Sequence, residues 1–197
     1  MKLFFYVLGI LLLTLGISFT IHSDLGTSPF DALLVGLSIH VGFTVGTWEI
    51  IIALILIGCN SLLKRQKPEV LGLLTAFITG ISIDMWLFLL ETLHTPELLY
   101  SKVVYFGLGL IVIGLGTAIY LHTNFAPIPI DRLTLIIHEL TRTNITFSRS
   151  IIYLLFLILA MIFKGPIGIG TLLIVCLSGL ILNYFMTFTK KVLVPVP

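Results

Sequence analysis

The sequence predicts an all-α polytopic membrane protein with six transmembrane helices and two short or re-entrant helices. Three observations support this fold class. The 197-residue chain is 58% hydrophobic and 10% charged, with a mean hydropathy of +1.17. Six apolar stretches are long enough to cross a bilayer, which takes about 20 residues per helix. An internal repeat relates the two halves of the chain at an offset of 100 residues.

The composition excludes several classes of function. A soluble domain has about 45–50% apolar and about 25% charged residues, so a soluble enzyme, a disordered chain and a nucleic-acid-binding module are all excluded. Eleven Lys and Arg against nine Asp and Glu leave a net charge of +2, which is too small to indicate a polyanionic partner. The expected environment is the lipid bilayer, with no nucleic acid partner and no cofactor or metal.

Charges and helix-breaking residues set the ends of the predicted elements. Two shorter apolar pieces, residues 29–41 and 129–140, reach only about 20 Å at about 1.5 Å per residue, so we do not expect them to cross the bilayer. The six expected spans are residues 3–21, 47–63, 70–93, 103–121, 147–163 and 167–188.

The internal repeat defines one transmembrane domain over residues 1–197, made of repeat 1 (1–98) and repeat 2 (99–197). Sliding the chain by 100 residues aligns its halves without a gap from residue 2 to residue 54. After a slip of one residue, Gly80 aligns with Gly179 and Asp84 with Asn183. The most informative matches join residues that are scarce in this chain: His22 with His122, Pro29 with Pro129 and Asp31 with Asp131.

The positive-inside rule favours an inverted repeat over a parallel one. If the short helices do not cross, each repeat has three spans, and eight basic residues lie inside against two outside, with Arg149 left at a span end. If they cross, the repeats are parallel and the tally is six against five. We therefore predict inverted repeats with both termini in the cytoplasm. The eight inside residues are then Lys2, Lys64, Arg65, Lys67, Arg132, Arg142, Lys190 and Lys191.

The start of each short helix holds a candidate functional residue. Ser28 suits an N-cap, and Asp31 follows three residues later, so the simplest interpretation is a helix start. In repeat 2 Ile128 cannot cap, yet Asp131 is present. Broken helices at repeat interfaces often bind substrate, so we predict Asp31 and Asp131 as symmetric pore or gate residues. The predicted helix-break element is Ser28, Pro29 and Pro129.

Asp84 is a second candidate, because a charge inside a span is costly and marks function by default. It lies four residues after Gly80 on a face of small residues that would pack against another helix. We predict Asp84 as a coupling or cation site, the alternative being a structural hydrogen bond. Asn183 at the equivalent position is polar without charge, which suits a proton or cation pathway in one half only.

Glu49 and Arg149 place opposite charges at equivalent positions in the two halves. In an inverted repeat they start on opposite sides of the membrane, so a direct pair requires both helices to begin inside the bilayer. The alternative is two interfacial charges. His22 and His122 end equivalent spans, and they are predicted either as protonatable gates or as interfacial residues bonded to loop carbonyls.

The stretch from Gly16 to Asp31, which contains LGTSPFD, and the later GFTVGTW at 42–48 resemble the YczE/YyaS/YitT family of bacterial integral membrane proteins. Repeat 2 departs from this pattern, with Ala-Pro-Ile-Pro at 126–129 in place of Gly-Thr-Ser-Pro. The resemblance implies a multi-pass protein of the bacterial plasma membrane. It also suggests export of small molecules or antibiotics.

The leading hypothesis is a multi-pass transporter or channel for a small molecule, with proton coupling. One alternative is the substrate-binding membrane subunit of an ATPase-driven transporter. Another is a non-transporting scaffold or accessory protein for a biosynthetic complex. The sequence contains no HExxH, GxSxG or P-loop motif, so we do not expect an enzyme. Faces of small residues also allow a homo-oligomer.

Overall fold

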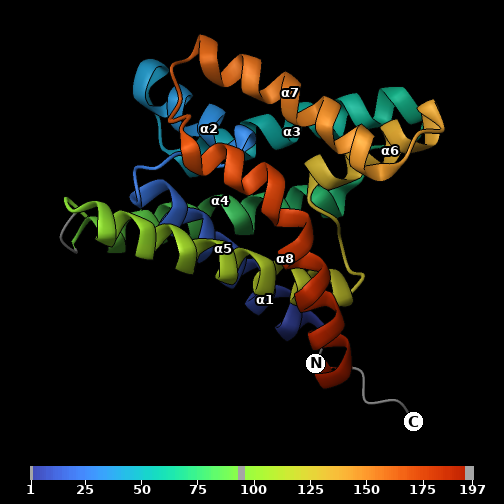
Figure 1. Cartoon of the computed structure of the whole chain (residues 1–197). Coiled ribbons are helices and arrows are strands. Elements are labelled where there is room, and N and C mark those ends of the chain that lie inside the picture. Colours follow the sequence, from blue (N-terminus) through green and yellow to red (C-terminus); the bar gives the residue numbers. More distant parts are fainter. Residues whose placement is uncertain (1, 93–95, 194–197) are drawn as a thin grey trace.

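The computed structural model describes residues 2–92 and 96–193, and every regular element in these ranges is an α-helix (Figure 1). The prediction of six long apolar helices and two short ones is confirmed. The short helices are α2 (Pro29–Val41) and α6 (Pro129–Thr141). The long ones are α1 (Lys2–His22), α3 (Val45–Lys64), α4 (Val70–Glu91), α5 (Leu99–His122), α7 (Ile145–Ile162) and α8 (Ile169–Leu193).

Local capping explains where several helices begin. The Ser28 hydroxyl accepts a hydrogen bond from the Asp31 amide at 3.2 Å, and Thr44 and Asn144 cap α3 and α7 in the same way. α6 begins at a proline without a side-chain cap, since isoleucine precedes it. α5 begins at Leu99, four residues earlier than predicted, because a long lysine at 102 is tolerated within its first turn. Residue 93, the predicted end of the fourth span, lies outside the described residues.

The first long helices of the two halves, α1 and α5, cross at small residues. A Cβ added at Gly9 would lie 3.0 Å from the carbonyl oxygen of Gly116, and one added at Gly16 would lie 2.7 Å from that of Gly109. Glycine lets the two backbones approach this closely. Because the contacts run in opposite directions along the sequence, α1 and α5 are antiparallel (Figure 1).

The remaining helices pack around this crossing in corresponding pairs. α4 packs on α1 as α8 packs on α5, and α3 contacts α6 as α7 contacts α2. α2 lies deep in the bundle, with residues 29–37 all buried. α6 is more polar, and it is tied to the end of α3 by an ion pair of 2.7 Å between Lys64 and Glu139.

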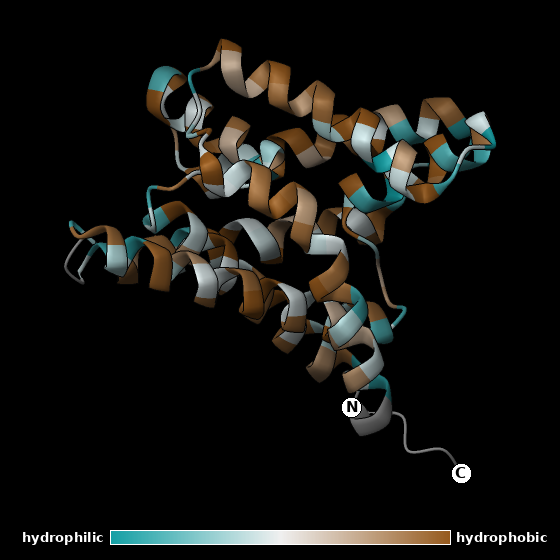
Figure 2. Cartoon of the chain, viewed as in Figure 1, coloured by the Kyte–Doolittle hydropathy of each residue, from teal (hydrophilic) through white to brown (hydrophobic). Residues whose placement is uncertain are grey.

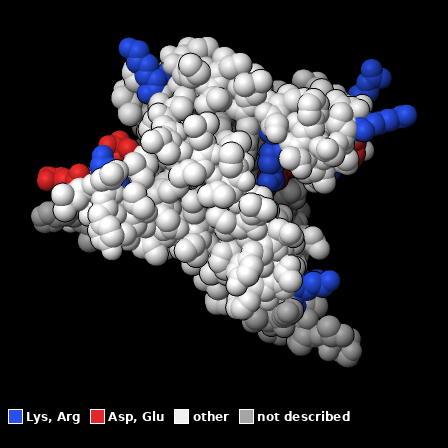
Figure 3. All heavy atoms as spheres, viewed as in Figure 1, with Lys and Arg blue, Asp and Glu red and all other residues white. Residues whose placement is uncertain are grey.

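The outside of the molecule is suited to lipid. Large apolar side chains such as Phe77, Ile81 and Phe88 of α4 are exposed, and hydrophobic residues follow the outer faces of the long helices (Figure 2). Charged atoms gather near the helix ends, and most of the visible face between them carries no charge (Figure 3). An exposed apolar surface of this extent is typical of a protein embedded in a membrane.

Candidate functional site

A cavity of about 350 Å³ lies where the two halves meet. All eight helices that the structure describes contribute to its lining. Its charged lining residues are Asp31, Glu49, Asp131 and Arg149. These are four of the residues that the sequence singled out, and the fold brings them into one site. Most other lining residues are aliphatic, so the charges face a largely apolar space.

Asp31 enters the cavity wall from the first turn of α2. Its side chain is buried, and the Ser28 hydroxyl donates a hydrogen bond of 2.6 Å to its carboxylate. The helix start that the sequence indicated is therefore present. The same residue also lines the cavity, so the capping interpretation and a role in solute contact are compatible.

Asp131, at the equivalent position of α6, lies in a different environment. The Tyr120 hydroxyl donates a hydrogen bond of 2.5 Å to one carboxylate oxygen, and the Arg149 guanidinium lies 3.3 Å from the other. These contacts join α5, α6 and α7. Arg149 thus pairs with Asp131. Glu49 lines the same cavity but forms no ion pair with Arg149.

Glu49 is the least satisfied charged group of the site. Only 2% of the residue is exposed, and within the described ranges no side chain or backbone group forms a hydrogen bond or ion pair with its carboxylate. It comes from the first turns of α3 and lines the same cavity as Asp31. A buried charge without a partner is costly. A positively charged ligand in the cavity would therefore stabilise the Glu49 carboxylate.

The two halves therefore build the same site with the sign of the charge reversed at one position. At an offset of 100 residues, Asp31 corresponds to Asp131 and Glu49 to Arg149. Repeat 2 holds an ion pair at this place, and repeat 1 holds two carboxylates. Tyr120, which sequence reasoning missed, completes the repeat 2 cluster. At the offset of 100 residues Tyr120 corresponds to Thr20, which is also polar and also lies near the end of its helix. This match of two polar residues was the sequence signal that could have identified Tyr120.

Asp84 lies outside the cavity wall, in the contact between α3 and α4. Its carboxylate accepts hydrogen bonds from the Thr44 hydroxyl at 2.6 Å and from the Gly46 amide at 2.7 Å. It therefore binds the N-terminus of α3, where a negative charge is favourable. A Cβ added at Gly80 would lie 2.5 Å from the carbonyl oxygen of Gly46, so the two helices touch through their backbones.

The equivalent contact is open in repeat 2. α7 and α8 diverge in Figure 1 and do not pack along each other in the ranges that the structure describes. Nothing lies within 4 Å of a Cβ added at Gly179, and Asn183 is exposed on α8. Both helices line the cavity, so its wall is interrupted between them. Figure 3 shows a notch between the α6–α7 end and α8.

The two histidines lie at the ends of α1 and α5, away from the cavity lining. The His122 ring nitrogen Nε2 lies 3.2 Å from the carbonyl oxygen of Met186, which belongs to α8 and not to a loop. The His22 ring packs against Tyr105 with ring centroids 5.3 Å apart. The predicted gating role of the histidines stays a prediction.

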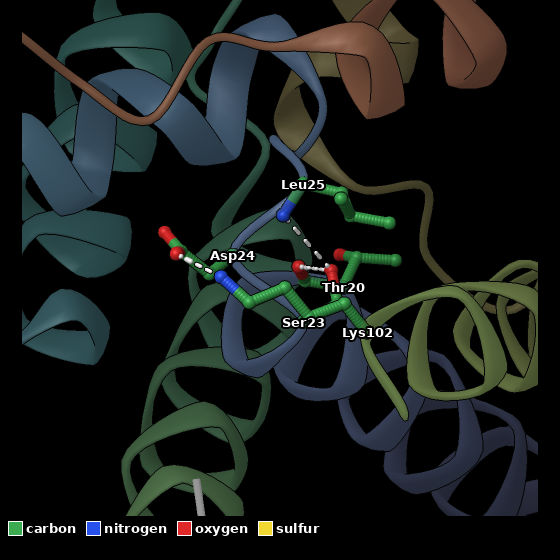
Figure 4. A network of polar contacts seen from close by, with 5 residues as sticks. All are labelled: Thr20, Ser23, Asp24, Leu25 and Lys102. Atoms are coloured by element: carbon green, nitrogen blue, oxygen red, sulfur yellow. Dashed lines mark hydrogen bonds and ion pairs between the residues drawn. The ribbon is translucent and has the colours of Figure 1, made fainter. Parts of the chain in front are cut away.

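The turn that follows α1 is fixed by a polar network (Figure 4). The Ser23 hydroxyl donates to the Thr20 carbonyl at 2.7 Å and accepts from the Leu25 amide at 3.4 Å. Lys102 of α5 reaches the Asp24 carboxylate at 2.6 Å. The Leu25 carbonyl in turn accepts from the amide of residue 170 at 2.8 Å. This network positions the start of α2, and with it Asp31.

The fold and the buried charges define a multi-pass α-helical membrane protein with a largely apolar cavity between its two halves, into which four charged residues project. A model of a family of unknown function (DUF6198) matches residues 1–187, and the chain belongs to this family.

The relatives of the chain include two proteins of Bacillus subtilis strain 168. The uncharacterized protein YyaS is 60% identical over 191 residues, covering 97% of this chain and 95% of YyaS. The uncharacterized membrane protein YczE is 38% identical, covering 91% and 83%. An uncharacterized protein of Haemophilus influenzae is 28% identical, covering 91% and 81%. No solved structure matches the chain. The resemblance to the YczE/YyaS group is thus confirmed.

Proposed function

We propose that this protein is a transporter that carries a small molecule across the bacterial plasma membrane. The observation that carries the proposal is the cavity between the halves, where four charged side chains from two broken-helix starts and two spans gather in an apolar bundle. Ionisable groups inside a membrane protein are costly and mark substrate or ion pathways. Transport sites commonly lie at the interface of repeats, beside discontinuous helices.

The proposal includes an inverted repeat. It is supported by the crossing of α1 and α5, where Gly9 meets Gly116 and Gly16 meets Gly109. At an offset of 100 residues these two contacts are equivalent to each other. A two-fold axis in the membrane plane relates equivalent helices in this way. The predicted topology then has both termini in the cytoplasm.

One of the differences between the two halves is the contact between their last two long helices, and this difference supplies a mechanism of alternating access. The α3–α4 contact is closed by Asp84 and the two glycines, whereas α7 and α8 are apart. In the proposed topology the closed contact faces the outside and the gap faces the cytoplasm. Exchange of the two arrangements, with α7 closing on α8 and α3 leaving α4, exposes the cavity to the other side.

We assign proton coupling to the cavity carboxylates of Asp31 and Glu49 and not to Asp84. Both Asp84 oxygens already accept hydrogen bonds that fasten α3 to α4, so protonation there would weaken the closed contact. Asp31 and Glu49 face the cavity, where a proton and a solute can compete for the same carboxylate.

Two-sided access to the cavity tests transport without knowledge of the substrate. A cysteine at Ser178, in the α8 wall, is introduced after replacing the exposed Cys59 and Cys176. We expect a membrane-impermeant methanethiosulfonate to label it in both right-side-out and inside-out vesicles, because the cavity opens to each side in turn. An exposed control, Asn124→Cys, is labelled from one side only. Labelling of residue 178 from a single side would contradict transport and favour a scaffold.

A further inference from the structure

We propose that the cavity binds an organic cation, an amine with an apolar body, whose ammonium group lies between Asp31 and Glu49. This inference rests on the proposed transport function and names the class of its substrate. It follows from three features: a charge comparison between the repeats, the unpartnered carboxylate of Glu49, and the apolar character of the remaining lining.

Repeat 2 shows what the aspartate at the start of the short helix binds. Asp131 receives a guanidinium from Arg149 and a hydroxyl from Tyr120. In repeat 1 the equivalent of the guanidinium is the Glu49 carboxylate, so Asp31 has a hydroxyl partner but no cation. A bound ammonium group would supply the positive charge that arginine supplies in the other half.

The charge balance of the cavity favours the same class of ligand. Three carboxyl groups face one guanidinium, and Arg149 is the only basic side chain among the described lining residues. That guanidinium is already engaged by Asp131. Only 2% of Glu49 is exposed, and its carboxylate has no hydrogen-bond or ion-pair partner within the described ranges. Buried carboxylates are stabilised by a paired cation with hydrogen-bond donors, which an ammonium group provides.

The rest of the lining does not suit a bare calcium ion. Ca²⁺ takes about six to eight oxygen ligands, whereas repeat 1 offers two carboxylates among side chains such as Leu13, Ile17 and Ile83. A cavity of about 350 Å³ falls in the range of small-molecule sites, which are mostly apolar with a few placed polar groups. An amine with an aromatic or aliphatic body matches both parts of this surface.

Three probes that share a body and differ in charge test the inference. Phenethylamine, phenethyl alcohol and hydrocinnamate are titrated into the purified protein in detergent and followed by isothermal titration calorimetry. We expect saturable binding of the amine only. Glu49→Gln and Asp31→Asn each remove one charge with little change in shape, and each should weaken amine binding by about tenfold or more.

A matched control is Glu139→Gln, which removes a carboxylate that does not line the cavity. Glu139 is exposed, and the hydrogen bond from Lys64 holds its pKa below the usual range; an exposed ion pair contributes little to stability. Amine affinity should be unchanged in this variant. Circular dichroism verifies that each variant is folded. If Glu49→Gln does not fold, Asp31→Asn still tests the inference.

The inference is overturned if the amine does not bind, if hydrocinnamate binds more tightly, or if folded Glu49→Gln and Asp31→Asn bind the amine as the native protein does. These outcomes are distinct from a failure of the transport proposal. Two-sided labelling of residue 178 without amine binding would leave a transporter of another substrate class. Amine binding with one-sided labelling would indicate a binding protein that does not transport.

Discussion

Replacing Gly80 with alanine is expected to force α3 away from α4 and open the cavity on that side. The new Cβ would lie 2.5 Å from the Gly46 carbonyl oxygen, and a backbone atom cannot rotate away as a side chain can. Overpacking of this kind costs about 1–3 kcal/mol, and every 1.4 kcal/mol is about a tenfold change in population. In vesicles carrying Ser178→Cys, labelling from the α3–α4 side should become about tenfold faster.

The chain provides a matched control for this variant. Gly179 aligns with Gly80 in the repeat, yet nothing lies within 4 Å of a Cβ placed there. Gly179→Ala should therefore leave the described arrangement in place and disfavour the opposite one, in which α7 closes on α8. If the cysteine at position 178 is labelled at the same rates from both sides in Gly80→Ala and in Gly179→Ala, the α3–α4 contact is not a gate.

Replacing Arg149 with glutamine is expected to lower stability, because it leaves the Asp131 carboxylate with only the Tyr120 hydroxyl as a partner. A hydrogen bond to a charged group contributes about 1.5–3 kcal/mol. Thermal unfolding in detergent, followed by tryptophan fluorescence, measures the loss. The double variant Asp131→Asn with Arg149→Gln should recover part of it, since no unpaired carboxylate then remains.

The double-mutant cycle separates this ion pair from general damage to the bundle. An interaction energy near zero, with the losses of the two single variants adding up, would mean that the pair contributes nothing. Asp31→Asn with Glu49→Gln serves as the comparison from repeat 1. Because neither of those two carboxylates forms an ion pair among the described residues, removing both should not destabilise the protein as Arg149→Gln does.

Most of the architecture was predictable, because helix ends in this chain are marked by strong local signals. Helix α2 begins at Pro29 and ends at Val41, as predicted. Apolar length identified the six long helices. The positions that match between repeats, Asp31 with Asp131 and Glu49 with Arg149, lie together in one cavity.

Side-chain partners were less predictable, because they depend on how helices are turned and spaced. Sequence spacing raised a possible pair between Glu49 and Arg149, whereas Arg149 contacts Asp131. Asp84 packs against a neighbouring helix as the small-residue face indicated, but its twin Asn183 is exposed. Among the described residues nothing lies within 4 Å of a Cβ placed at Gly179, and α7 and α8 do not pack along each other. A pattern of small residues does not reveal whether its contact is formed.

The orientation of the two halves tests the central claim most directly. Asp24 and Asn124 are equivalent at the offset of 100 residues, and both are exposed in the turns that follow α1 and α5. A single cysteine is placed at one or the other position in a background without Cys59 and Cys176, and intact cells are treated with an impermeant thiol reagent. Inverted repeats predict labelling at 24 and none at 124. Labelling at both positions would mean parallel repeats and would contradict the alternating-access account.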